Sequence, residues 1–145
     1  MQNLEQIVYI SRAQFPISTN KYILEPEVQA ILAVARSKNR LHKLVGVLCF
    51  GDGYFLQCLQ GEQITLDRLY ENLLRDSRHT DIKLLSTMPI NELTFAKWSM
   101  KFVGVGSEMR EMLAAKGHQL FEPHRFSEET INNVIWNLIE AEQSA

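Results

Sequence analysis

The sequence has no long hydrophobic run. Its longest apolar stretch, Leu44 to Phe50, is far shorter than the ~20 residues that a membrane-spanning helix needs. The N-terminus, Met1 to Glu5, has no basic region followed by an apolar core, which a secretory signal would require. We therefore expect a soluble protein, most simply cytoplasmic, with no membrane partner.

A strong charge of either sign is also missing. The 15 Lys and Arg residues and the 17 Asp and Glu residues are interspersed and give a net charge of −2. A nucleic-acid-binding domain normally carries a basic patch or stripe on one face. We therefore expect no direct contact with nucleic acid.

Cysteine is scarce, with only Cys49 and Cys58 present. They lie on two runs that read as a hairpin around Gly51-Asp52-Gly53. If Phe50 pairs with Tyr54, the two cysteines lie ~10 Å apart along the strands and on opposite faces. A disulfide needs Cα atoms within ~7 Å, so we expect two free thiols.

Generic enzyme signatures are absent as well. There is no phosphate-binding loop, no paired CxxC, no HExxH and no nucleophile elbow. The four histidines, at positions 42, 79, 118 and 124, do not have metal-ligand spacing. We expect no metal site and no enzymatic activity.

The 145 residues are 46% hydrophobic, which suits one domain with a continuous core. Alternating and helical apolar patterns, with Gly and Pro punctuation, predict nine elements. The expected strands are 4–11, 44–50, 54–60, 82–88 and 97–103. The expected helices are about 25–40, 63–76, 107–116 and 127–141, and 15–24 reads as a loop.

The element order is therefore βαββαββ followed by αα. This order predicts an α+β fold of the ferredoxin-like type, with two helices on one face of the sheet. The other face would be left bare, so we expect the C-terminal helix pair to cover it. The apolar stripe of Val134, Ile135, Leu138 and Ile139 is suited to that packing.

Two polar side chains are expected inside this core. Gln57 shares a strand face with Phe55 and Leu59, and Tyr9 shares one with Ile7. A buried amide without a partner costs about 1–3 kcal/mol, so Gln57 needs a polar neighbour. A purely structural hydrogen bond would satisfy each of them.

Three further positions are ambiguous when taken singly. Trp98 and Met100, with Phe102, are expected to alternate down one face of the last strand, as packing or as part of a site. Asn39, near the end of the first helix, reads either as a C-cap or as a binding residue.

Taken together, six short motifs resemble one family, the BLUF (blue light using FAD) photoreceptors. They occur in order over residues 4–103, and the closing helices resemble the short, stand-alone members. The motifs are Val8–Ser11 (VYIS), Ala35–Asn39 (ARSKN), Val45–Phe50 (VGVLCF), Tyr54–Gly61 (YFLQCLQG), Asp76–His79 (DSRH) and Trp98–Met100 (WSM).

The resemblance implies that FAD is bound non-covalently, with FMN or riboflavin as substitutes, in a flavin-binding domain of residues 1–105. It implies that Tyr9 is the photochemical electron donor and Gln57 the switching amide. Residues 106–145 would then form a helical extension. The flavin contacts implied by the motifs and by the two helix stripes are Ile31, Lys38, Asn39, Phe55, Gln57, Leu73, Asp76, Arg78 and His79, with Trp98 or Met100 near the ring.

Four positions depart from the family pattern. Lys38 stands where Asn or His is common, Val45 where Thr is, Gln60 where Glu is, and Asn72 where Arg is frequent. Lys38 and Asn72 bear on the flavin contacts, whereas the Tyr9–Gln57 pair is unchanged.

The resemblance implies a partner protein in a signalling or transcription-control pathway, reached through the last strand and the C-terminal helices. A homo-oligomer remains open. Two other classes stay open as alternatives: a flavin-dependent enzyme, and a ferredoxin-like binding module without flavin that stacks RNA bases on Tyr9 and Phe55.

Overall fold

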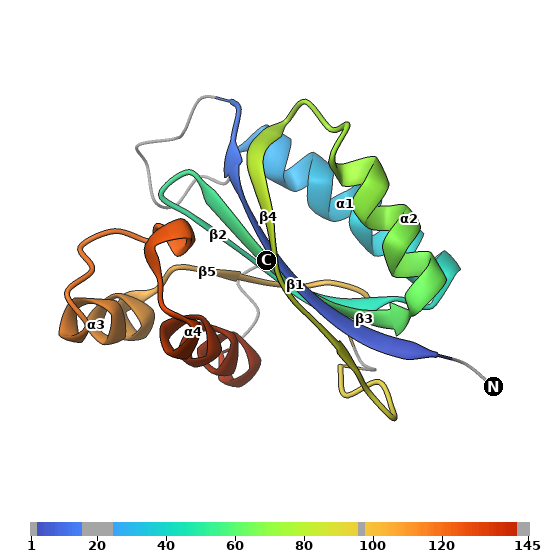
Figure 1. The fold of residues 1–145 in the computed structure, drawn as a ribbon. Helices are drawn as coiled ribbons and strands as arrows, with labels where there is room; N and C mark the ends of the chain where they lie inside the picture. The colour runs from blue at the N-terminus through green and yellow to red at the C-terminus, as the bar shows by residue number, and fades with distance from the viewer. Residues whose placement is uncertain (1–2, 16–24, 96–97, 142–145) are drawn as a thin grey trace.

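The computed structural model describes residues 3–15, 25–95 and 98–141 (Figure 1). The strands are β1 (Leu4–Ala13), β2 (Val45–Gly51), β3 (Tyr54–Glu62), β4 (His79–Pro89) and β5 (Lys101–Gly104). The helices are α1 (Pro26–His42), α2 (Gln63–Leu73), α3 (Ser107–Ala115) and α4 (Glu128–Glu140), with a short 3-10 turn at Pro123–Arg125.

The five strands form one sheet in the order β4-β1-β3-β2-β5. The neighbouring pairs are antiparallel except for β2 and β5, which are parallel. Helices α1 and α2 lie side by side on one face, and α3 and α4 lie across the other (Figure 1). The expected α+β, ferredoxin-like arrangement with a C-terminal helix pair is therefore confirmed.

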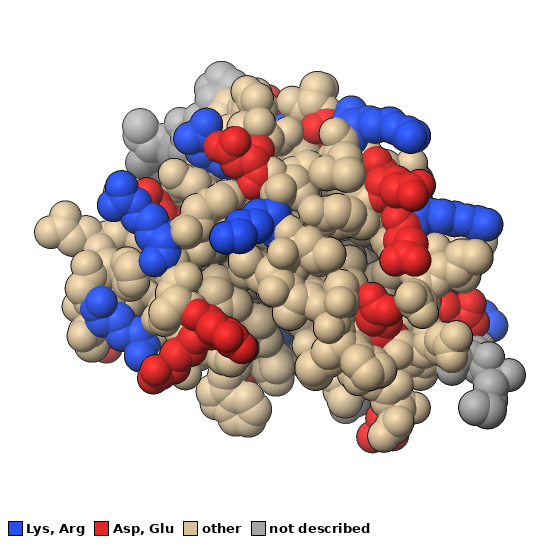
Figure 2. Space-filling view, in the orientation of Figure 1, with Lys and Arg blue, Asp and Glu red and all other residues tan. Residues whose placement is uncertain are grey.

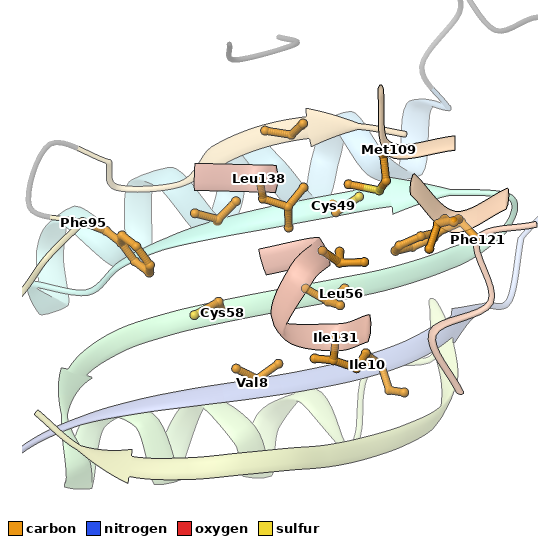
Figure 3. Packing of buried hydrophobic residues seen from close by; sticks show 14 of the residues in the cluster. Val8, Ile10, Cys49, Leu56, Cys58, Phe95, Met109, Phe121, Ile131 and Leu138 are labelled. Atoms are coloured by element: carbon orange, nitrogen blue, oxygen red, sulfur yellow. The ribbon is translucent and has the colours of Figure 1, made fainter. Parts of the chain in front are cut away.

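Each face of the sheet has its own apolar core. The core beneath α1 and α2 contains Ile7, Tyr9, Phe55 and Leu59 from the two central strands. The opposite core joins Val8, Ile10, Leu56 and Cys58 to α3 and α4 (Figure 3). The two sets alternate along β1 and β3, as the two-residue period of a strand requires.

Two helix ends differ from the expected boundaries by two residues or more. Helix α1 continues to His42, and Lys43 caps it with a left-handed φ of 58°. Helix α2 ends at Leu73 rather than at residue 76. The earlier end follows from Asp76, whose carboxylate accepts hydrogen bonds from the backbone and side chain of Arg78 and so favours a turn.

The register of the β2–β3 hairpin differs by one residue from the prediction. Asp52 and Gly53, with φ of 51° and 86°, form the two-residue turn, so Phe50 pairs with Phe55 rather than with Tyr54. Cys49 and Cys58 therefore share the face of α3 and α4. The expectation of opposite faces was wrong, but both thiols are free as predicted.

Strand β5 begins at Lys101, later than the expected residue 97, and Lys97 lies outside the described residues. The backbone carbonyls of Trp98, Ser99 and Met100 accept hydrogen bonds from Gly46 N and from the side chains of Asn39 and Arg36. Because these carbonyls bond to a single backbone amide and to side chains, residues 98–100 do not join the sheet.

The connection between β4 and β5 is anchored by a buried amide, Gln60, whose exposed fraction is 1%. Its Oε1 accepts from the backbone N–H groups of Thr94 and Phe95, and its Nε2 donates to Gln6 and to the Thr94 hydroxyl. Gln60 therefore fixes this connection to the middle of the sheet.

The C-terminal helices dock through apolar and ionic contacts. Ile131, Val134 and Leu138 of α4 are buried on the sheet, and Ser127 caps the helix by accepting a hydrogen bond from Thr130 N. At the hairpin turn, Asp52 accepts from Arg110 of α3 at 3.0 and 3.1 Å and from Phe121 N at 2.8 Å. This carboxylate ties α3 and the segment after it to β2 and β3.

Two kinds of feature are absent from the described part of the chain. None of its helices combines the length and apolar composition needed to cross a membrane. Within the same residues, no group of three or more His, Cys, Asp or Glu side chains is arranged to hold a metal ion.

The Asp52 contacts predict a pH-dependent part of the stability. Burial would raise the pKa of Asp52, but the Arg110 and Phe121 hydrogen bonds and the Arg110 charge together hold it below its ordinary value of 3.8. A lowered folded-state pKa stabilises the fold above the unfolded-state pKa, and this contribution is lost as the pH falls through the folded value. Urea unfolding should therefore show a stability difference between wild type and Asp52→Asn at pH 7 that shrinks towards pH 3.

The control for this measurement is Asp67→Asn, which removes an exposed carboxylate from α2. It separates the loss of the Asp52 contacts from the loss of one negative charge. A stability difference for Asp52→Asn that stays constant from pH 7 to pH 3 would contradict the assignment.

Candidate functional site

A cavity of about 500 Å³ lies between α1, α2 and the sheet. This volume is within the range of about 300–1,000 Å³ that is typical of small-ligand sites. Both helices contribute apolar residues to the cavity lining, with Ile31 and Ala35 on α1 and Leu69 and Leu73 on α2. Its floor is the sheet, where the polar side chains of Tyr9 and Gln57 line the cavity.

Tyr9 and Gln57 are directly opposed in the ladder between β1 and β3. Paired residues of an antiparallel ladder project to the same face, so both side chains enter the core beneath the helices. The Tyr9 hydroxyl donates a hydrogen bond to Gln57 Oε1. The exposed fractions are 1% for Tyr9 and 6% for Gln57, so this polar pair is buried.

The surroundings keep Tyr9 as a neutral phenol. Burial raises the pKa of Tyr9 well above its ordinary value, and the nearby Tyr70 and Asp76 raise it further. The Tyr70 ring also meets the Tyr9 ring edge to face, with centroids 6.0 Å apart. Tyr9 therefore keeps its hydroxyl proton and donates it in a hydrogen bond to Gln57 Oε1, and its ring packs against Tyr70.

Asn39 reaches the cavity from the last full turn of α1. Its side chain is buried, lines the cavity and donates from Nδ2 to the carbonyl of Ser99 at 2.6 Å. The C-cap interpretation of Asn39 is wrong, because Lys43 occupies that position. The Asn39 amide instead connects the cavity to the segment before β5.

The cavity end near the last turn of α2 is charged. Arg78 and Asp76 both line the cavity and form an ion pair, with Nη2 and Oδ2 2.6 Å apart. The Arg78 hydrogen bonds outweigh partial burial and hold the pKa of Asp76 below its ordinary value. His79 lies outside the cavity lining, where its Nδ1 is 2.8 Å from Ser11 Oγ and its ring contacts Phe55.

Trp98 and Met100 lie on different faces of the sheet. Met100 is buried in the core beneath α1 and α2 and lines the cavity. Trp98 packs with the opposite core and stacks on Phe95 at 5.7 Å. The expected single face is correct for Met100 and Phe102, which share the core beneath α1 and α2, but wrong for Trp98, because residues 98–100 are not a strand.

The segment from Trp98 to Lys101 joins the cavity to α4. Met100 and the Asn39–Ser99 hydrogen bond belong to the cavity side. On the other side, the buried Lys101 donates from Nζ to the Ile139 carbonyl at 2.9 Å and lies 4.2 Å from the centroid of the Trp98 ring. Ile139 is in the last turn of α4, where the helix dipole favours a cation.

The cavity gathers most of the residues that the sequence singled out. Those that line it are Tyr9, Ile31, Lys38, Asn39, Gln57, Leu73, Asp76, Arg78 and Met100, whereas Phe55, His79 and Trp98 do not. Sequence reasoning missed Val34, His42, Thr65, Arg68 and Leu69, which also line it. Helical spacing was the available signal, because these residues continue the stripes that contain Ile31 and Leu73.

The chemistry of the lining defines a class of ligand. Both helices contribute aliphatic side chains to the lining, while the amides of Asn39 and Gln57 and the Tyr9–Gln57 hydrogen bond supply donors and acceptors. Lys38, Arg68 and Arg78 place cations around the cavity, and Asp76 is the acidic residue of the lining. This set suits a flat ring with apolar faces, a polar edge and an anionic tail.

Comparison with known proteins agrees with this description. A family profile described as "Sensors of blue-light using FAD" (BLUF) matches residues 4–101. Photoactivated adenylate cyclase subunit beta of Euglena longa is 31% identical over 112 residues, which is 77% of this chain and 12% of that protein. The chain thus spans about an eighth of the length of that relative.

Two solved structures of the protein BlsA resemble the whole chain. The BlsA ground state superposes with a TM-score of 0.87 at 32% identity, and covers 98% of this chain and 91% of that one. The BlsA photo-activated state has a TM-score of 0.85 at 32% identity, with coverage of 98% and 99%. The likeness includes the C-terminal helices, which lie beyond the residues matched by the family profile.

Proposed function

This chain belongs to the BLUF family, the sensors of blue light using FAD, and from that premise we propose that it is a photoreceptor without enzymatic activity of its own. The observation that supports this most directly is the buried Tyr9–Gln57 hydrogen bond at the floor of the cavity. We propose that residues 1–105 bind FAD non-covalently and that residues 106–145 form the output part.

The lining residues fit a flavin. Ile31 and Leu73 would cover the faces of the ring, and Asn39 and Gln57 would meet its polar edge. Asp76 and Arg78, with Lys38 as a further cation, would serve the ribityl and phosphate portion, which favours FAD or FMN over riboflavin. Phe55 and His79 would act indirectly, since they do not line the cavity: Phe55 belongs to the core on the same sheet face, and the His79 ring contacts Phe55 and lies beside Ser11.

When bound, the flavin supplies absorption of blue light and one-electron redox chemistry. With flavin bound, Tyr9 would give it an electron and the hydroxyl proton would follow through the hydrogen bond to Gln57 Oε1; recombination would return both to Tyr9 and leave the Gln57 hydrogen bonds rearranged. An amide carries an acceptor and two donors on one rotor, so a half turn of Gln57 would place Nε2 against the Tyr9 hydroxyl. The Tyr9 hydroxyl would then accept a hydrogen bond from Gln57 Nε2 instead of donating one to Oε1. This is the second arrangement of the pair.

We propose that this rearrangement reaches α4 through residues 98–101. Asn39 and Met100 line the cavity with Gln57, and Asn39 is bonded to the Ser99 carbonyl. If the Asn39 side chain turned, its hydrogen bond to the Ser99 carbonyl would change, and this is one of the few hydrogen bonds that hold residues 98–100. Lys101 then transmits the change to the Ile139 carbonyl, and from α4 the signal passes to a partner protein, most simply in the cytoplasm.

The alternative of an RNA-binding module is not favoured. Base stacking requires exposed aromatic faces, but the exposed fractions of Tyr9 and Phe55 are 1% and 2%. Helices α1 and α2 also cover the sheet face to which both belong. Adenylate cyclase activity, which the name of the Euglena relative describes, is not proposed for a chain that spans 12% of that protein.

Tyr9→Phe should abolish the reversible blue-light change in the visible spectrum and leave flavin bound. The substitution removes only the hydroxyl, so packing is nearly unchanged while the proposed donor of electron and proton is lost. Absorption spectra before and after blue illumination provide the measurement. Tyr70→Phe is the matched control, since it removes a neighbouring hydroxyl, and it should keep the change. A photoactive Tyr9→Phe would refute the mechanism.

Asn39→Ala should weaken flavin binding, because loss of a ring-edge hydrogen bond costs about 1 kcal/mol or more, a factor of roughly five to ten in Kd. Fluorescence titration with FAD measures this directly. Asn72→Ala makes the same truncation at an exposed position of the cavity and should have the smaller effect. Equal affinities for the wild type and Asn39→Ala would assign Asn39 to anchoring Ser99 alone.

Lys101→Met should uncouple α4 while keeping the photochemistry. The substitution preserves an apolar stem over Trp98 but removes the donor to Ile139. Hydrogen exchange across residues 128–140 should rise on illumination of the wild type. In Lys101→Met it should already be high in the dark and change little with light. Lys83→Met, at an exposed lysine of β4, is the control. Identical protection of α4 in dark and light in the wild type would exclude this route.

A further inference from the structure

Helix α4 exposes a large aromatic side chain. It buries Ile131, Val134 and Leu138 on the sheet, and its opposite side holds Trp136, of which 64% is exposed. Tryptophan is highly buried on average, and it is enriched among the residues that dominate the binding energy of protein interfaces. An indole left in solvent on a helix with a complete apolar face is not needed for packing.

Acidic and amide side chains surround Trp136. Glu129, Asn132 and Asn133 precede it by seven, four and three residues, and Glu140 follows it by four, so all lie on the same side of the helix. Helix α4 contains three glutamates and no lysine or arginine. Glu129 has an ion-pair contact with Lys116 at 3.6 Å, yet 82% of its side chain remains exposed. Figure 2 shows acidic side chains over the position of α4.

The charge of the chain is unevenly divided around this helix. Residues 1–106 contain twelve Lys and Arg against ten Asp and Glu, whereas residues 107–145 contain three against seven. The overall net charge of −2 conceals this separation. The negative charge is therefore concentrated in the segment that carries Trp136. Such a charge distribution steers a positively charged partner towards α4 and repels an acidic one.

Two properties of an aromatic ring beside carboxylates select the same partner chemistry. A guanidinium or ammonium group is attracted to the face of an indole, and the glutamates provide ion pairs at its edge. Lys101 and Trp98 already make such a contact inside this protein, at 4.2 Å.

We propose that the outer face of α4, defined here as Glu129, Asn132, Asn133, Trp136 and Glu140, is the docking surface for a partner protein that presents Lys or Arg side chains beside an apolar patch. The proposal rests on the proposed function in one respect, since it names the chemistry of the signalling partner. The cation stacks on Trp136, the glutamates pair with neighbouring cations, and Lys101 connects this helix to the cavity.

The test uses the full chain with bound flavin and two labelled helical peptides of about 18 residues. Both peptides share one leucine stripe; the polar positions are Lys and Arg in one and Glu in the other. Fluorescence anisotropy should show binding of the basic peptide only, weakening as salt is raised. Trp136→Ala should reduce its affinity about tenfold or more. Glu129→Gln with Glu140→Gln should reduce the salt dependence.

Leu41→Ala is the matched control, because Leu41 is 76% exposed on α1 and lies outside both the cavity lining and α4. It should leave peptide binding unchanged. The proposal is overturned if Trp136→Ala binds like the wild type, if Leu41→Ala loses binding equally, or if the acidic peptide binds as tightly. An oligomer that dissociates in Trp136→Ala, seen by light scattering, would assign the face to a second copy and also overturn it.

The photochemical readout is kept separate. The reversible blue-light spectral change should be the same in Trp136→Ala and in the wild type, because Trp136 is on the solvent side of α4. Peptide binding that depends on Trp136 in a protein without a spectral change would support the docking surface and refute the photoreceptor function.

Discussion

The rest of this structure depends on one hydrogen bond between two polar side chains in an apolar core. Tyr9 and Gln57 face each other across the two central strands, and each supplies the partner that the other's burial requires. Such a pair is stable only while it stays matched, because an unpaired buried hydroxyl or amide costs about 1–3 kcal/mol. The register of β1 against β3 is therefore tied to the pair. If either strand slipped by one residue, Tyr9 and Gln57 would lie on opposite faces of the sheet.

The sheet separates two apolar cores, one on each of its faces. The face beneath α1 and α2 holds the cavity, and the face beneath α3 and α4 holds a separate apolar core. Strands β1 and β3 contribute alternate residues to both, so a change in one side chain does not by itself move the other face. The segment from Trp98 to Lys101 differs, because its consecutive residues contact both sides.

Most of the architecture could be predicted from the sequence because it follows from local patterns. Alternation placed Tyr9 and Gln57 on the correct face, and helical spacing placed Ile31 and Leu73 in stripes that both line the cavity. The hairpin register was wrong because of the two-residue turn, and two other errors arose where a side chain competes with the backbone for hydrogen bonds. Asp76 ends α2 early, and Asn39 and Arg36 take carbonyls that a longer β5 would need. The Asn39 and Arg36 contacts join residues 60 and 64 positions apart, which no local pattern encodes.

The same competition makes residues 98–100 suitable for transmitting a small change. A strand in this position would be fixed by a continuous ladder, and shifting it would break several backbone hydrogen bonds together. Here, two of the three carbonyls are held by single side-chain hydrogen bonds, with a net contribution of about 1 kcal/mol for the Asn39 amide and about 1.5–3 kcal/mol for the charged Arg36. In the proposed mechanism, a rearranged Gln57 amide in the neighbouring cavity would need to change only one of these hydrogen bonds. Gln60 holds the preceding connection in place through Thr94 and Phe95. In the proposed route, movement would therefore be concentrated in this irregular segment, between a fixed anchor and the Lys101 contact with α4.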